Sequence, residues 1–161
     1  MTQGETDTTS DAGPVGIGGW LVLPVIGVVL TLVRGLLSLL DLQGLEGMAS
    51  RLTQAQLTFV IAEIIGNALV LFLLPLVLLV LLARKKRSFP RLYIVWAVAA
   101  FVFLVGDLVI ANIVFREVFA SGAAELLDAD TVRALVSSAV LVLVWVPYML
   151  NSRRVKNTFV N

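Results

Sequence analysis

A small set of polar side chains stands inside otherwise apolar stretches of this sequence, and three of them can carry charge. Arg34, Glu63 and Asp107 are surrounded by Leu, Val and Ile, and Asn67 follows Glu63 by four residues. Charged groups in an apolar setting are costly unless they are paired or hydrated, so they mark ion pathways, proton relays or interhelical pairs. Two acids against one Arg leave one carboxyl in excess, which makes that carboxyl a candidate proton carrier.

These residues fall in stretches long and apolar enough to cross a bilayer as helices. A hydrocarbon core about 30 Å thick needs about 20 helical residues. Spans of this kind are predicted at 20–40, 58–82, 92–115 and 132–150. The sequence therefore predicts an all-α fold, an integral membrane four-helix bundle within 16–150. A disordered cytoplasmic tail is expected at 1–15 and a basic cytoplasmic tail at 151–161.

Composition agrees with a membrane setting and narrows the chemistry. The 161 residues are 59% hydrophobic and 14% charged, with a mean hydropathy of +0.99, whereas soluble domains carry about 25% charged residues. The chain has no Cys and no His, which removes disulfides, thiolate nucleophiles and metal sites built on those ligands. We therefore expect no enzyme activity, no metal and no cofactor, and the net charge of +1 gives no reason to expect a nucleic-acid partner.

The distribution of Lys and Arg predicts the orientation in the membrane. Two segments, the connection after the second span and the C-terminal tail, share eight of them: Arg84, Lys85, Lys86, Arg87, Arg91, Arg153, Arg154 and Lys156. The opposite side has Arg51 and Arg116, with Arg133 at a helix edge. By the positive-inside rule both termini are cytoplasmic, where the basic segments would meet anionic lipid headgroups. Because Val155 and Phe159 are four residues apart, the tail is expected to lie on the inner leaflet.

Two further patterns concern the cytoplasmic half of the spans. All the Trp and Tyr residues fall near that side (Trp20, Tyr93, Trp96, Trp145 and Tyr148), which indicates either interfacial anchors or an aromatic pocket. Pro24, Pro75 and Pro147 each remove a backbone hydrogen bond and predict kinks, which either shape the bundle or form a gate.

Counting along straight helices predicts that the charged residues share one layer. Arg34 lies fourteen residues from Trp20 and Asp107 lies fifteen from Leu92, so both are expected about 21 to 23 Å from the cytoplasmic side. Asn67 is expected level with them and Glu63 about one turn further out. Arg34 is therefore predicted to pair with Asp107 or Glu63, in a layer that either fixes helix packing or carries protons.

The first span adds a stripe of small and polar residues at intervals of three and four: Gly27, Thr31, Arg34, Ser38 and Asp41. Small residues let helices approach closely in lipid, and charges avoid hydrocarbon. The stripe is therefore expected to face other helices.

Two segments resemble a known family. They read GIGGWLVLPVIGVVL at 16–30 and PYMLNSRRVKNTFV at 147–160, and they are similar to the start and finish of the domain of unknown function 2569 family of bacterial inner-membrane proteins. The matching positions are Gly18, Gly19, Trp20, Pro147, Tyr148, Ser152, Arg154, Val155, Lys156, Thr158 and Phe159. The resemblance implies four helices and a bacterial inner-membrane location, and it brings no assigned reaction, ligand or catalytic residue.

Three hypotheses for function follow. The first is a non-catalytic membrane protein that acts by association with itself, as a homo-oligomer, or with a membrane complex. The second is a small transporter or proton-coupled channel that uses Arg34, Glu63 and Asp107. A membrane enzyme with Glu63 and Asp107 as acid and base comes third, because no nucleophile motif, metal cluster or phosphate loop accompanies them.

Overall fold

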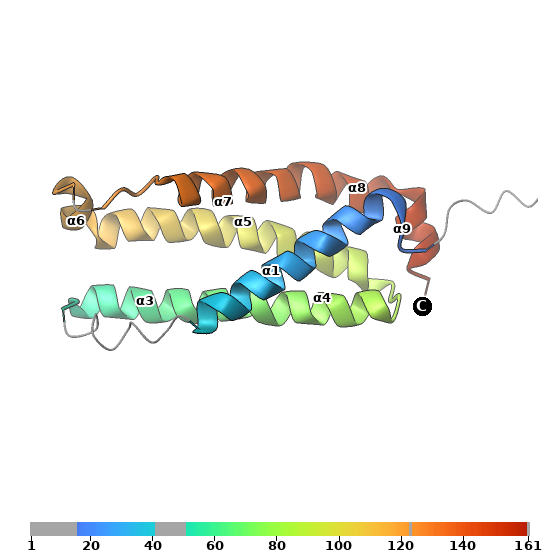
Figure 1. Ribbon diagram of the computed structural model, residues 1–161, viewed down its shortest axis with the longest axis horizontal. Coiled ribbons are helices and arrows are strands. Elements are labelled where there is room, and N and C mark those ends of the chain that lie inside the picture. Colours follow the sequence, from blue (N-terminus) through green and yellow to red (C-terminus); the bar gives the residue numbers. More distant parts are fainter. Residues whose placement is uncertain (1–15, 41–50, 123, 161) are drawn as a thin grey trace, which may run out of the picture.

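The computed structural model describes residues 16–40, 51–122 and 124–160, and every regular element in these ranges is helical (Figure 1). Four helices are long and apolar enough to cross a membrane: Gly19–Ser38, Gln54–Ala83, Ser88–Val114 and Ala129–Asn151. The prediction of an all-α chain with four such helices is confirmed. The tail predicted at 1–15, and Asp41 of the predicted stripe, lie outside the described residues.

The first helix consists of a short 3-10 turn, η1 (Gly19–Leu21), and α1 (Val22–Leu40). The second joins α3 (Gln54–Asn67), η3 (Ala68–Leu73) and α4 (Leu74–Ala83). The third is α5 (Ser88–Val114), followed by the short α6 (Arg116–Ala120). The fourth joins α7 (Ala129–Val140), η4 (Leu141–Trp145) and α8 (Val146–Asn151), and α9 (Arg153–Thr158) closes the chain.

The second and fourth helices begin several residues before the apolar stretches do, because polar residues cap their first turns. At α3 the Thr53 hydroxyl accepts from the Gln56 backbone N–H at 3.4 Å, and the Gln56 side chain accepts from the Thr53 N–H at 3.0 Å. At α7 the Asp128 carboxylate accepts from the Thr131 N–H at 2.7 Å. These bonds satisfy amide groups that have no partner inside the helix, so each helix extends beyond its apolar segment.

Three of the long helices run side by side, with α5 between the second and fourth helices, and α1 crosses this layer obliquely (Figure 1). The crossing is fixed where α1 packs on η3 and α4. A Cβ atom at Gly35 would lie 2.5 Å from the Leu71 carbonyl oxygen, so only glycine allows the two backbones to approach this closely. Gly35 therefore determines where α1 meets the second helix.

Proline reshapes two of the long helices. The π-helical segments η3 and η4 end shortly before Pro75 and Pro147. In η3 the Leu74 N–H bonds to the Leu69 carbonyl five residues back, so the next donor in that register would belong to Pro75, which has none. The Val70 carbonyl is thereby left without a helical partner, and the Trp96 indole N–H donates to it at 2.8 Å. At Pro75 and Pro147 the helices thus contain π segments, one of which anchors α5, whereas Pro24 lies in the first turn of α1 without one.

The tightly packed core lies at one end of the molecule, where the basic α4–α5 turn and α9 meet. Its members come from every long helix and from α9: Leu21, Val28, Leu78, Leu82, Phe89, Tyr93, Trp96, Ala97, Met149, Val155 and Phe159. By contrast, α3, α6 and α7 contribute no fully buried residue. Tyr93 and Trp96 belong to this core, so they neither anchor at the interface nor line an aromatic pocket.

Candidate functional site

The residues that resemble the family motif come together from the two ends of the chain at the packed end of the bundle. The Thr158 hydroxyl accepts from the Gly16 N–H at 2.9 Å and donates to the Gly16 carbonyl at 3.3 Å. The Arg154 guanidinium lies against Gly18 and Gly19, where an added Cβ would come within 3.0 and 3.5 Å of it. Gly19 also has φ +55°, a conformation that disfavours other residues. We call Gly16, Gly18, Gly19, Arg154 and Thr158 the terminal clasp.

The C-terminal segment completes the terminal clasp by folding onto the bundle. The Ser152 hydroxyl caps α9 by accepting from the Val155 N–H at 3.4 Å. The Phe159 ring stacks on Phe89 with centroids 4.6 Å apart, and Val155 is buried. The prediction that Val155 and Phe159 rest on the inner leaflet is therefore wrong, because their apolar side packs in the protein core. Arg87 holds the end of the chain by donating from Nε to the Val160 carbonyl at 2.9 Å.

The remaining motif residues have separate roles. Pro147 lies in the first turn of α8, and Tyr148 packs edge-on against Trp145 with centroids 5.8 Å apart. Trp20 and Lys156 are exposed beside the terminal clasp. Most of the family motif is therefore explained as packing and hydrogen bonding between the two chain ends.

Three residues of the predicted intramembrane cluster lie on neighbouring helices. Glu63 and Asn67 lie one turn apart on α3, and Asp107 lies on α5, which packs against α3. Toward the α4–α5 turn, Gly66 packs directly against the Phe103 ring. On the other side the Phe59 and Phe115 rings meet with centroids 6.0 Å apart. Glu63 and Asp107 thus lie between these two aromatic contacts along α3 and α5.

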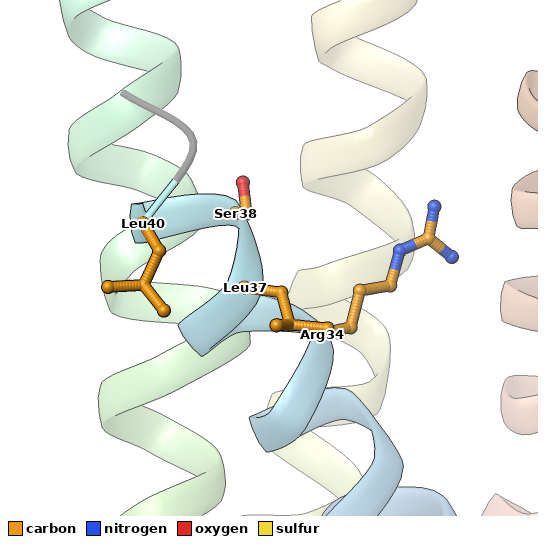
Figure 2. Close-up of a pocket in the computed structure, with 4 residues that line it drawn as sticks. All are labelled: Arg34, Leu37, Ser38 and Leu40. Atoms are coloured by element: carbon orange, nitrogen blue, oxygen red, sulfur yellow. The ribbon is translucent and has the colours of Figure 1, made fainter. Parts of the chain in front are cut away.

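Arg34 is not part of that group. Its side chain is exposed and extends away from α1 (Figure 2). It lines an open hollow of about 590 Å³ together with Leu37, Ser38 and Leu40. The ion pair predicted between Arg34 and Asp107 or Glu63 is not formed, and within 16–40, 51–122 and 124–160 the one ion pair joins Arg133 and Asp130 at 3.3 Å.

The tilt of α1 explains this difference. Counting residues from the helix ends assumed parallel helices, whereas α1 runs obliquely and therefore gains less depth per residue (Figure 1). Gly35 contacts Leu71, which places Arg34 near the level of Leu71. Glu63 precedes Leu71 by eight residues on the second helix. It therefore lies about 12 Å from that level, on the side away from the α4–α5 turn. Asn67, which was expected at the level of Arg34, precedes Leu71 by four residues and lies about 6 Å from it in the same direction.

The stripe on α1 also differs from its prediction. The residues that α1 buries against the bundle are Leu21, Pro24, Val28 and Gly35, which fall on a neighbouring side of the helix. A Cβ added at Gly27 would meet no atom within 4 Å, and Arg34 and Ser38 are exposed. The stripe therefore borders the open side of α1. Gly35, which the stripe omits, makes the close helix contact; the available signal was a glycine among the leucines of 32–40.

The described residues contain no group of three or more acidic, His or Cys side chains that could hold a metal ion. A fold of four spanning helices with charged residues inside the spans defines a multi-pass membrane protein rather than a soluble bundle.

Comparison with known proteins agrees with this class. The model of the family described as protein of unknown function (DUF2569) matches residues 14–160, and the chain belongs to that family. It is also similar to the inner membrane protein YdgK of Escherichia coli (strain K12), with 28% identity over 155 residues that cover 92% of this chain and 96% of that protein. No solved structure shows significant similarity. The relative and the four helices together support the bacterial inner membrane as the location.

Proposed function

We propose that this protein is a non-catalytic, multi-pass inner-membrane protein that acts by association within the bilayer, with itself or with a larger membrane complex. The observation that supports this most directly is the exposure of Arg34 beside an open hollow on α1. Leu71, which marks the level of Arg34, lies twelve residues from Ala83 and seventeen from Gln54, so this level is near the middle of the membrane.

The energetics of an exposed arginine favour a covering partner. An Arg side chain near the bilayer centre costs about 2.5 to 3.5 kcal/mol on insertion scales. Extending the side chain toward an interface lowers this cost, and a partner that supplies hydrogen-bond acceptors lowers it further. The apolar side chains around the hollow add surface that a second helix would bury by close packing.

The proposal includes an orientation with both termini in the cytoplasm. The described residues of the basic end are Arg84, Lys85, Lys86, Arg87, Arg91, Arg153, Arg154 and Lys156, gathered on the α4–α5 turn and α9. Cations at the cytoplasmic surface attract anionic headgroups by about 1 kcal/mol each. The basic end is therefore expected to lie against the inner leaflet.

Association is tested by extracting the protein in polymer nanodiscs directly from membranes and measuring the particle mass. The expected result is a particle that holds more than one protein chain. Arg34→Leu should shift the population toward single chains, Arg34→Lys should retain the association, and Arg153→Leu serves as a matched control outside the spans. Particles with a single chain in the unmodified protein would contradict the proposal.

A second candidate, proton-coupled transport, is favoured by the placement of Glu63 and Asn67 on α3 and of Asp107 on the neighbouring α5. A carboxyl group beside a second acid can exchange protons if water reaches it. In proteoliposomes Glu63→Gln should then abolish flux driven by a pH gradient while the protein stays folded. Equal flux in the unmodified protein, in Glu63→Gln and in empty liposomes would exclude this candidate.

A further inference from the structure

We infer that the open side of α1 binds a transmembrane helix of a different protein, and that this helix presents a carboxylate to Arg34 near the middle of the membrane. The inference rests on the proposed association and specifies the chemistry of the partner. It depends on three features of α1: the free space beside it, the donors in the hollow, and the depth of Arg34.

The space beside α1 suits a second helix. Leu30 and Leu37 are 63% and 60% exposed, and no atom of the described residues lies within 4 Å of a Cβ built at Gly27. A glycine in the middle of a helix is unfavourable by about 1 kcal/mol relative to alanine, and no described neighbour requires a small residue at this position. Close approach of an external helix would make use of the missing side chain.

The hollow supplies the donors that a carboxylate needs. The guanidinium of Arg34 is a planar fork of N–H groups that matches the two oxygens of a carboxylate. Ser38 lies four residues on and lines the same hollow, so its hydroxyl is a second donor. Leu37 and Leu40 add apolar surface beside these donors, and a helix packed against this surface would exclude water and strengthen the charge pair.

Depth distinguishes a foreign helix from a second copy. In a parallel pair related by a two-fold axis along the membrane normal, equivalent residues lie at equal depth. The acids within the described part of the spans are Glu63 and Asp107, and Glu63 precedes Leu71 by eight residues, or about 12 Å. Lipid headgroups are also distant, since the interface is about 15 Å from the bilayer centre. Because neither a described acid of the spans nor a headgroup lies at the level of Arg34, we assign the carboxylate to another protein.

The test uses synthetic helices as defined probes. The purified full chain, with a donor fluorophore, is reconstituted in zwitterionic liposomes with acceptor-labelled Leu/Ala helices of about 20 residues. The probes carry Asp, Asn or Leu at the centre, or Asp displaced two turns. We expect the central Asp helix to bind about tenfold tighter than the Leu helix. Arg34→Leu should remove that preference, Ser38→Ala should reduce it, and Arg153→Leu should leave it unchanged.

Each other outcome overturns the inference in a recognisable way. Equal binding of the Leu and Asp helices, or an Asp preference that survives in Arg34→Leu, shows that no carboxylate is recognised by Arg34. Self-association that depends on Arg34 and excludes every probe identifies a second copy as the occupant, and the proposed association then stands. Failure of all probes, together with single chains in nanodiscs, overturns both proposals. Arg34→Lys, which keeps the charge, should retain part of the preference and controls for misfolding.

Discussion

The Trp96 indole N–H donates to the Val70 carbonyl oxygen at 2.8 Å, and the residue that creates this acceptor is Pro75, on the same helix. The π-helical turn shifts each backbone hydrogen bond by one residue. The N–H that would bond to the Val70 carbonyl therefore belongs to residue 75, which is proline and has no N–H. One side chain on α5 thus supplies the hydrogen bond that proline removes from the second helix.

This relationship predicts a double-mutant cycle. Trp96→Phe should lower the free energy of unfolding by about 1 to 3 kcal/mol, because it leaves the Val70 carbonyl unsatisfied. In a Pro75→Ala background residue 75 has an N–H, so the same change should cost less. Reversible unfolding in mixed micelles measures both values. Equal losses in the two backgrounds would mean that the indole contributes by packing alone.

The terminal clasp predicts a local effect at the two chain ends. Thr158→Val keeps the shape of the side chain but removes both hydrogen bonds to Gly16, at a cost of about 1 kcal/mol for the folded end. Thr158→Ser retains the hydroxyl and is the matched control. Amide exchange should accelerate at residues 16–21 and 153–159 in Thr158→Val only. Unchanged protection there would show that the aromatic stacking of Phe159 suffices.

The N-cap of α7 predicts a dependence on pH. Hydrogen bonds from the Thr131 backbone N–H and side chain hold the pKa of Asp128 below its ordinary value. A carboxyl with a depressed pKa stabilises the fold above its unfolded pKa of about 3.9, and this contribution is lost as the pH falls through the folded value. Protection of the first turn of α7 should therefore decrease below about pH 4. Asp128→Asn, a cap that does not titrate, should abolish the dependence; a pH response that survives the substitution would have another origin.

Orientation is tested by reporter fusions. Alkaline phosphatase, which is active only outside the cytoplasm, should be inactive when fused after Asn161 and active when fused within 45–53. The physical reason is the excess of Lys and Arg on the side of the α4–α5 turn and α9. The reverse pattern would overturn the assignment of both termini to the cytoplasm.

Much of the fold was predictable because insertion in a bilayer depends on apolar length, which is a local property of the chain. The packing of the helices that carry Glu63 and Asp107 was also within reach, since consecutive spans joined by a short connection tend to lie side by side. The position of Arg34 was not, because it depends on the tilt of α1. That tilt depends on how α1 packs on η3 and α4, including the close approach of Gly35 to Leu71, and hydropathy carries no information on crossing angle.

The terminal clasp shows the same limit at the chain ends. Residues 147–160 were recognised as a motif, yet the burial of Val155 and Phe159 depends on a contact with Phe89, far away in the sequence. An apolar pair four residues apart fits a lipid surface and a protein core equally well.

The most direct test of association through α1 is photo-crosslinking in intact membranes. A photoreactive phenylalanine analogue at Leu37, beside Arg34 in the hollow, should give one discrete protein adduct that persists with Arg34→Lys and disappears with Arg34→Leu. The same analogue at Val95, a 62% exposed position on α5, should give no such adduct. Lipid adducts alone at Leu37, or a protein adduct indifferent to the charge at residue 34, would contradict association through this side of α1.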